Sequence, residues 1–390
     1  MINHVRKVLI VGGGIGGLSA GIALRKISIE VEIAEIQKEW NVYGVGIIQP
    51  ANALRALDNL GVLEACLQHG FSYPGFSYHT GQGHKFAKPE SPRIEGYPGV
   101  NGLSRRKLHN ILLDAATIAG TEIRMGITVQ TIENKDDHVF VEFTDGTSAM
   151  YDLVIGADGT NSRVRDLLFG EVNQEYVGQA VWRYTLPRPE EVNTGIFYFG
   201  QKGKAGLVPM SKEEMYLLLT THELDNPKMP VDQLDQLLRE RLQEFGGIIA
   251  QVRNQITDAS SVVYRPIFSY LMRAPWHRGR VILIGDAAHS TTPHLGQGAS
   301  LAIEDAVVLA ELLEQGDDIQ QNLSAFTERR FERCRIVVDN SRQLVQWELM
   351  EWEGRMPKDV NIAEFTKNTL VKMNEPILQP HIHLERRVGL

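Results

Sequence analysis

A cluster of glycines near the start of the chain has the spacing of a phosphate-binding turn. Gly12, Gly14 and Gly17 follow the apolar run 7–11 and precede a segment, 17–26, with helical periodicity. In a strand–turn–helix unit the first glycine permits a tight turn, the second lets the backbone approach a pyrophosphate, and the third lets helix and strand pack closely. The N–H groups and the dipole of the helix N-terminus then favour negative charge. The pattern predicts a dinucleotide site, with a plain strand–helix turn as the alternative.

An acidic residue follows at the distance that a ribose contact requires. Glu35 comes directly after the second predicted strand, residues 30–34, and lies eighteen positions beyond Gly17. A carboxylate here accepts hydrogen bonds from a ribose 2′-OH and repels a 2′-phosphate, so we expect a nucleotide of the FAD or NAD type rather than NADP. The neighbouring residues expected to contact the same nucleotide are Ile15, Gly16 and Ile36.

Two later segments carry further turns that contain glycine and aspartate. The sequence DLVIGADG spans residues 152–159, and GRVILIGDAAH spans residues 279–289, with Pro293 and the glycines of 296–298 after it. Together with the first glycine cluster, these motifs resemble, in order and spacing, those of the single-component flavoprotein aromatic hydroxylases. That family includes salicylate, hydroxybenzoate and hydroxynicotinate hydroxylases. The resemblance covers about residues 5–350.

The resemblance implies non-covalently bound FAD and gives roles to single positions. Asp286 would bind the ribityl chain or a ribose, and Arg105 would meet the FAD phosphates. Asp158 would contact the pyrophosphate and the nicotinamide coenzyme, the backbone of Val129 would touch adenine, and segment 44–52 would reach the flavin ring. A simple turn at Asp158 and a helix cap at Asp286 are the structural alternatives. The full set of contacts expected on this basis is Gly46, Ile47, Arg105, Val129, Asp158, Gly285, Asp286, Pro293, Gly296, Gly298 and Ala299.

The chemistry implied by the resemblance is the hydroxylation of a small, electron-rich aromatic or N-heteroaromatic compound. NADH or NADPH reduces FAD, O2 adds at the flavin C4a, and the hydroperoxide transfers one oxygen to the ring. A helix that begins near Gly298 would stabilise negative charge on the reduced flavin. The sequence contains a single GxGxxG motif, so we expect no second nucleotide domain for the transient electron donor. A flavin hydroxylase or epoxidase of the lipid, quinone-pathway or carotenoid type is the runner-up, and an FAD-binding protein without activity is a third reading.

Candidate substrate contacts lie outside these motifs. Tyr216 stands in an alternating strand pattern at a position that, by resemblance, faces the substrate, although a half-buried structural tyrosine is an equal alternative. His294 follows Pro293 and would border the site from the flavin side. Lys204 or Lys202 could pair with a substrate carboxylate, but solvated loop lysines are the favoured reading. We assign no catalytic base and no metal ligands.

Composition excludes several classes of function. A net charge of −8 and a pI near 5.9 argue against nucleic-acid binding, which needs a basic surface. Two distant cysteines indicate a reducing compartment, so we expect a cytoplasmic protein, monomeric or homodimeric. Residues 6–24 imitate a signal peptide, but the six glycines of 12–21 fit the nucleotide turn better. No apolar stretch is long enough to cross a membrane.

The elements that position these residues indicate an α/β fold. We expect a Rossmann-like FAD-binding domain with three layers (ββα), an inserted and mostly antiparallel substrate-binding sheet, and C-terminal helices. The predicted FAD-binding domain comprises residues 1–74, 101–175 and 274–316. The substrate-binding domain takes residues 75–100 and 176–273, and residues 317–390 form the helical C-terminal segment.

Single helices are expected over 51–67, 231–245 and 322–350, and one strand over 123–131. Residues 356–390 could be a dimer contact or a pocket lid, but a plain surface extension is slightly preferred.

Overall fold

The first unit of the fold is a six-stranded sheet that brings the three glycine-containing turns to one edge. The computed structural model describes residues 5–41, 45–316 and 318–378. The strand order is β18-β19-β12-β1-β2-β8, and all neighbours are parallel except β18, which is antiparallel to β19. The strands are β1 Lys7–Val11, β2 Glu30–Glu35, β8 Glu122–Met125, β12 Leu153–Gly156, β18 His277–Arg278 and β19 Val281–Leu283. Because β1, β12 and β19 are parallel neighbours, the turns at their carboxyl ends lie side by side.

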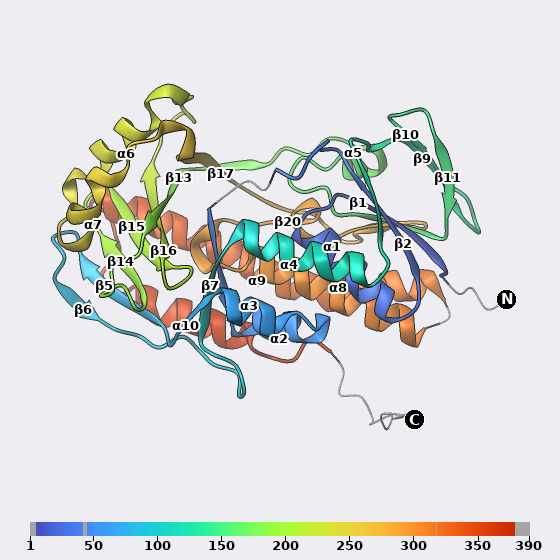
Figure 1. Cartoon of the computed structure of the whole chain (residues 1–390), viewed down its shortest axis with the longest axis horizontal. Helices are drawn as coiled ribbons and strands as arrows, with labels where there is room; N and C mark the ends of the chain where they lie inside the picture. Colours follow the sequence, from blue (N-terminus) through green and yellow to red (C-terminus); the bar gives the residue numbers. More distant parts are fainter. Residues whose placement is uncertain (1–4, 42–44, 317, 379–390) are drawn as a thin grey trace.

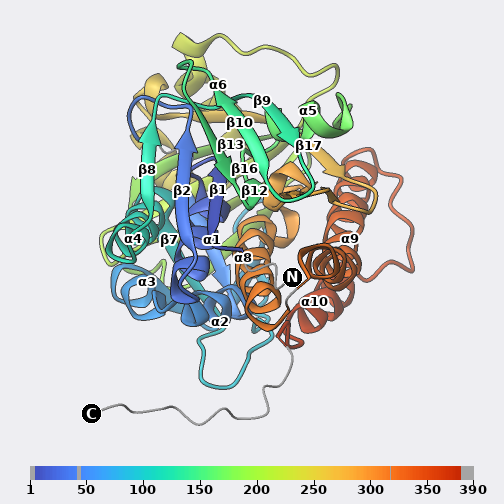
Figure 2. The same cartoon turned by 90° about the vertical axis from the view of Figure 1, so that its right-hand side faces the viewer.

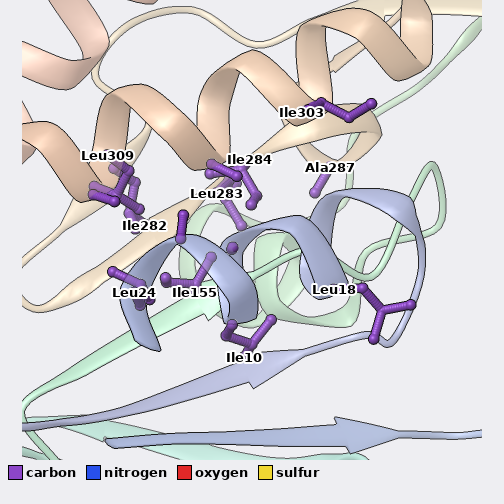
Figure 3. Packing of buried hydrophobic residues seen from close by; sticks show 14 of the residues in the cluster. Ile10, Leu18, Leu24, Ile155, Ile282, Leu283, Ile284, Ala287, Ile303 and Leu309 are labelled. Carbon is purple, nitrogen blue, oxygen red and sulfur yellow. The ribbon is translucent and has the colours of Figure 1, made fainter. Parts of the chain in front are cut away.

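Helices cover one face of this sheet and a small sheet covers the other (Figures 1 and 2). The helices are α1 Ile15–Lys26, α4 Arg105–Ile118 and α8 Gly298–Gln315, and the small sheet has the order β11-β10-β9. Its strands are β9 Val129–Asn134, β10 Val139–Phe143 and β11 Ser148–Tyr151. Buried side chains of β1, α1, β19 and α8 interlock between sheet and helices, among them Ile10, Leu18, Ile282 and Leu309 (Figure 3). The predicted three-layer α/β fold is confirmed.

The second unit is an eight-stranded sheet in the order β20-β17-β13-β16-β15-β14-β5-β6. It is antiparallel apart from the β5–β14 pair, as expected for the inserted sheet. The strands are β5 Phe76–Thr80, β6 Lys85–Ala87, β13 Glu175–Pro187, β14 Gly195–Phe199, β15 Gly203–Pro209, β16 Glu214–His222, β17 Val263–Leu271 and β20 His289–Ser290. Because β20 lies beyond residue 273, the sheet extends past the predicted domain boundary, and the division into domains stays a prediction.

Smaller elements connect the two units. A three-stranded sheet, β3-β7-β4, consists of β3 Gly46–Pro50, β7 Val100–Ser104 and β4 Phe71–Tyr73. The short helices are α5 Arg163–Phe169, α6 Leu234–Arg241 and α7 Gly247–Val252, with α6 and α7 beside the eight-stranded sheet (Figure 1). The Ser104 hydroxyl caps α4, accepting a hydrogen bond from the N–H of Lys107 at 3.2 Å.

Several predicted elements are divided in the structure, and glycine explains two of the divisions. The helix expected over 51–67 is split into α2 Ala51–Leu60 and α3 Leu63–His69, because Gly61 adopts a left-handed φ of +79° and ends the first helix. The strand expected over 123–131 is likewise β8 and β9 in different sheets, separated at Gly126 with φ +76°. The helix expected over 231–245 is only α6, with 3₁₀ turns on both sides.

The C-terminal helices join the two units. α9, Ile319–Trp352, runs beneath both sheets (Figure 1), and α10, Ile362–Met373, packs against it. Met373 is fully buried, and the Phe365 ring meets Trp347 edge-on at 4.8 Å. The preferred reading of residues 356–390 as a plain surface extension is therefore wrong for the described part, 356–378. None of the helices in the described ranges combines the length and apolarity that a membrane crossing requires.

Two carboxylates of α8 are buried and paired with arginines of α9. The Arg330 guanidinium donates to Asp305 Oδ1 at 2.7 Å and to Glu304 Oε2 at 2.9 Å. Asp305 Oδ2 accepts from the N–H of Gly285 and pairs with His289 Nε2. Although burial opposes ionisation, His289 and Arg330 lower the pKa of Asp305 to about 2, so its carboxylate stays charged.

Removing Arg330 tests whether this pairing holds the fold together. We expect Arg330→Met to lower the free energy of unfolding by about 3–5 kcal/mol, because two buried carboxylates lose the guanidinium group that they share. Arg335→Met on the same helix removes only exposed ion pairs with Glu332 and Asp339, and should cost less than about 1 kcal/mol. Urea unfolding of both variants measures the difference; equal small losses would show that the buried network is dispensable.

Candidate functional site

One cavity of about 830 Å³ lies between the turn edge of the first sheet and the eight-stranded sheet. Residues from all three predicted motifs line it, together with side chains of β13 to β16. Of the residues predicted to bind cofactor or substrate, the cavity wall contains Gly14, Ile15, Gly16, Glu35, Gly46, Ile47, Arg105, Tyr216, Gly285, Asp286, Pro293, His294, Gly296, Gly298 and Ala299. The sequence motifs therefore converge on a single space.

The glycines of the first turn divide into two kinds. Gly12 has φ +106°, and a Cβ atom built on Gly17 would lie 1.9 Å from the carbonyl oxygen of Gly12. A Cβ atom on Gly14 would meet no atom within 4 Å. Gly12 and Gly17 thus shape the turn, whereas Gly14 exposes bare backbone to the cavity at the N-terminus of α1. This cradle fits the pyrophosphate of FAD.

Glu35 lies at the same end of the cavity and is held by backbone N–H groups. Its carboxylate accepts hydrogen bonds from the N–H of Gly13 at 2.7 Å and from the N–H of Gln37 at 2.8 Å. His109, which sequence reasoning missed, bonds to the carbonyl oxygen of Gly13 through Nε2 at 3.0 Å. Burial lowers the pKa of His109, so the ring is neutral and Nε2 donates. Trp40 packs on this ring at 4.7 Å and also lines the cavity.

Besides Gly12 and Gly17, which shape the turn, three predicted cofactor residues lie off the cavity wall. Ile36 is 62% exposed on the surface, and Val129 is fully buried in the core. Asp158 accepts hydrogen bonds from the Ser162 hydroxyl and from the N–H of Val164, at the start of α5. The structural alternative for Asp158, a local turn and cap, describes these bonds. Cofactor contacts of Ile36, Val129 and Asp158 stay predictions.

Asp286 behaves differently from Asp158. It lines the cavity, and among the described residues its carboxylate forms no hydrogen bond or ion pair. Burial raises its pKa, and His289 and Arg105 partly offset this rise. An unpaired carboxylate in a cavity that also contains the glycine cradle fits a hydroxyl-bearing ligand such as the ribityl chain of FAD.

Two arginines add positive charge to the same cavity. Arg105 and Arg183 both line it, and neither forms an ion pair within the described ranges. Burial, together with the nearby Arg105, lowers the pKa of Arg183 to about 10. Two guanidinium groups that share a cavity without a carboxylate partner favour an anionic ligand such as the phosphates of FAD. Arg183 was not identified from the sequence, because a single arginine in a strand carries no motif.

Tyr216 is buried against the strand predicted to reach the flavin. A Cβ atom on Gly46 of β3 would lie 2.1 Å from Cδ1 of Tyr216, so only glycine lets this ring pack there. Tyr216 is 4% exposed, and burial raises its pKa to about 12, so its phenol is protonated at neutral pH. The residue reaches the cavity as predicted, but its role as a substrate contact stays a prediction.

Lys204 and His294 form another part of the cavity wall, and together with the buried Glu348 behind them they make a triad. The Lys204 ammonium pairs with Glu348 Oε1, and His294 Nε2 lies 3.0 Å from Glu348 Oε2. His294 Nδ1 is 3.0 Å from the Thr292 hydroxyl. Burial lowers the pKa of His294, so the neutral ring donates through Nε2 and accepts at Nδ1. Both ring nitrogens are therefore engaged, and His294 positions Glu348.

The triad corrects one expectation and reveals a missed residue. The sequence favours a solvated loop position for Lys204, but its side chain is only 15% exposed and faces the cavity. Lys202, the other candidate, is exposed and does not line the cavity. Glu348 was missed because it lies 144 residues from Lys204, on α9.

Substitution of two glycines separates the cradle from the turn. We expect Gly14→Ala to raise the Kd for FAD by about tenfold or more, because a methyl group would occupy the space that faces the phosphates. Stability of the apoprotein should stay unchanged, since that methyl group meets no protein atom. Gly17→Ala should instead lower apoprotein stability. FAD titration by fluorescence and thermal unfolding measure the two effects; unchanged FAD affinity of Gly14→Ala would contradict the cradle.

The triad also predicts a pH dependence of stability. Burial alone would raise the pKa of Glu348, but Lys204 and His294 lower it to about 2. A carboxyl with a lowered folded-state pKa stabilises the fold above its unfolded value near 4.5, and this contribution disappears as pH falls toward 2.

We expect the stability difference between wild type and Glu348→Gln to approach about 3 kcal/mol above pH 5 and to shrink below pH 4.5. Urea unfolding between pH 3 and 7 tests this, with the exposed Glu351→Gln on the same helix as control. A difference that does not vary with pH would contradict an ionised Glu348.

Comparison with known proteins places this geometry in a family. The family model described as an FAD binding domain matches residues 6–341. A Bacillus subtilis protein named as the FAD-dependent monooxygenase YetM is 35% identical over 88% of this chain and 94% of its own length. The 2-heptyl-3-hydroxy-4(1H)-quinolone synthase of Pseudomonas aeruginosa is 32% identical over 98% of both chains.

A solved structure agrees with these relatives. Klebsiella pneumoniae HpxO in complex with FAD and uric acid superposes with a TM-score of 0.78 and 25% identity, over 95% of this chain and 93% of that one. The bare Gly14 backbone, the unpaired Asp286 and the Arg105–Arg183 charge fit the cofactor that these proteins bind. The chain belongs to the FAD-binding-domain family and is an FAD-dependent flavoprotein monooxygenase.

Proposed function

We propose that this monooxygenase hydroxylates an aromatic or N-heteroaromatic ring, with NADH or NADPH as electron donor and O2 as oxygen source. The observation that carries the proposal is the continuity of the cavity. One space connects the Gly14 cradle and the N-terminus of α8 with a sheet face that holds both a buried lysine and aromatic rings. A ring compound and the cofactor can therefore lie in contact within one cavity.

Bound FAD supplies electron transfer from the nicotinamide and the activation of O2. The protein contributes charge at two places. α8 begins at Gly298, and its first N–H groups favour a negatively charged part of the ligand at the helix N-terminus. The Lys204 ammonium has three donors, of which one bonds to Glu348, so the others can bind an oxygen substituent of the substrate.

The lysine suits the electronic demand of hydroxylation. An aromatic hydroxyl group supplies more electron density when it is deprotonated, and a nearby ammonium lowers the pKa of that hydroxyl. Glu348, held by His294, fixes the position of Lys204 and balances its charge when the site is empty. Lys204 is thus proposed as the substrate contact, and His294 and Glu348 as positioning residues.

The relatives support a heteroaromatic substrate. The Pseudomonas protein is named for a hydroxyquinolone, and the Klebsiella structure contains uric acid. Both compounds are bicyclic rings with nitrogen in the ring and oxygen substituents that an ammonium group can bind. We also propose a cytoplasmic location, because Cys66 and Cys334 are buried free thiols. A monomer or a homodimer is the proposed state of assembly.

A substrate screen tests the proposed function. The FAD-loaded protein is supplied with NADH or NADPH and with hydroxybenzoates, hydroxypyridines, aminobenzoates, 4-quinolones or uric acid, while coenzyme oxidation, H2O2 and products are measured. The expected result is faster coenzyme oxidation with one ring class and a product that carries one oxygen from ¹⁸O2. Oxidation that yields only H2O2 with every ring, or oxygen transfer only to an isoprenoid lipid, would overturn the proposal.

Replacement of the lysine tests the substrate contact. We expect Lys204→Met to raise KM for the hydroxylated ring by roughly ten- to hundredfold, because a charge-assisted hydrogen bond is lost, and to leave the Kd for FAD unchanged. Lys202→Met removes an exposed lysine two residues away and should change neither constant. Steady-state kinetics and FAD titration give both values, and equal KM values in the two variants would exclude Lys204 as the contact.

A further inference from the structure

The eight-stranded sheet carries a continuous group of aromatic side chains, here called the aromatic band. It consists of Phe76 and Tyr78 on β5, Phe86 on β6, and Phe197 and Phe199 on β14. Neighbouring rings lie 5.3 to 6.4 Å apart, centroid to centroid. Phe76, Tyr78 and Phe197 line the cavity, whereas Phe86 is 60% exposed. The band therefore extends from the cavity wall to the surface.

Strand register explains why the band starts beside the triad. Across the sheet, Lys204 on β15 pairs with Phe199 on β14, and Phe197 pairs with Gly206. A Cβ atom on Gly206 would lie 2.8 Å from the Phe197 ring, so the ring lies over the bare glycine backbone. The Lys204 ammonium is 6.0 Å from the centre of the same ring. The polar contact and the apolar surface are thus immediate neighbours.

α10 contributes a second wall to the same cavity. Its lining residues are Ala363, Thr366, Lys367 and Leu370, with Asn374 directly after the helix, and they share one face at spacings of three, four and seven residues. The opposite face carries Phe365, Thr369 and Met373, which pack against α9. α10 is therefore fixed to α9 on one side and open to the cavity on the other.

The two walls meet at the end of α9. Glu348 binds Lys204, and its neighbour Trp347 packs against Phe365 of α10. At the other end of α10, Arg55 donates to the carbonyl oxygens of Asn374 at 2.8 Å and Glu375 at 2.7 Å. α10 thus spans the cavity from the triad to α2 and is held at both ends.

We propose that the substrate ring carries an apolar chain, and that this chain lies between the aromatic band and the inner face of α10, with Leu370 as a specificity-determining residue. The inference rests on the proposed function, because it assumes that the ring oxygen binds Lys204. A compact polar ring would leave Phe197 and Tyr78 in contact with water, whereas an alkyl chain of several carbons would cover them. The chain would extend from the ring toward the exposed Phe86.

A series of 4-quinolones with 2-alkyl chains from methyl to nonyl tests the proposal. Binding is measured by perturbation of the flavin spectrum of the FAD-loaded protein, and turnover by product formation. In the wild type we expect affinity to rise by up to about fourfold per methylene over the first carbons, because each methylene leaves water. The heptyl compound should bind at least about tenfold more tightly than the methyl compound.

Variants of α10 locate the chain. Leu370→Trp narrows the space, so the optimum should move to shorter chains, while Leu370→Ala should move it to longer ones. Val371→Trp adds the same bulk one residue away, on a side chain that is 50% exposed, and should leave the profile unchanged. If Leu370→Trp does not fold, Leu370→Ala and Thr366→Leu, on the same inner face, give the same comparison.

The outcomes separate this inference from the proposed function. If no aromatic compound in any class binds or is hydroxylated, the proposed function fails. If aromatic compounds bind but affinity does not depend on chain length, or if the Leu370 and Val371 variants share one profile, the apolar-chain inference fails and the hydroxylase proposal stands.

Discussion

Two adjacent carboxylates on α8, Glu304 and Asp305, are both fully buried, and the arrangement of the cavity depends on how they are paired. Asp305 binds the N–H of Gly285 in the third glycine turn. Glu304 accepts a hydrogen bond from the side-chain amide of Asn52, and the same amide forms two hydrogen bonds with Gln297. Gln297 lies between Gly296 and Gly298, two glycines predicted to contact the flavin. A buried carboxylate without partners would lower the stability of the fold by several kcal/mol. The Gly285 turn and the segment around Gln297 are therefore held where they can bind these carboxylates.

Glu304 also connects the cofactor end of the cavity with α10, the helix that lines its outer wall. Arg333 binds both oxygens of Glu304 and also the carbonyl oxygens of Lys372 and Met373, in the last turn of α10. An arginine at a helix C-terminus is favoured by the helix dipole as well. The position of α10 is therefore set by Glu304, the carboxylate that also binds Asn52 and through it holds Gln297. Changes in the C-terminal segment can alter the site without touching the cofactor.

The sequence predicted the parts of the site that depend on backbone shape, and missed those that depend on distant side chains. Gly12, Gly14 and Gly17 were recognised because a tight turn and a close phosphate approach admit few other residues. Asp158 and Asp286 both follow buried strands, so their different surroundings could not be separated by sequence alone. The pairing of Lys204 with Glu348 joins β15 to α9, and no local pattern encodes a contact between residues 144 positions apart.

The eight-stranded sheet shows why substrate specificity was the feature that the sequence predicted least well. Alternation in β16 indicated which of its residues share a face, but the row of side chains that crosses the sheet depends on strand register. Arg183 pairs with Leu218, Leu218 with Gly206, Gly206 with Phe197, and Phe197 with Tyr78. A slip of one residue in any strand would turn its side chains to the opposite face. The gradient from a cation near the nucleotide turns to aromatic rings near the surface therefore exists only in the folded sheet, and in the function proposed above it is this gradient that orients the substrate.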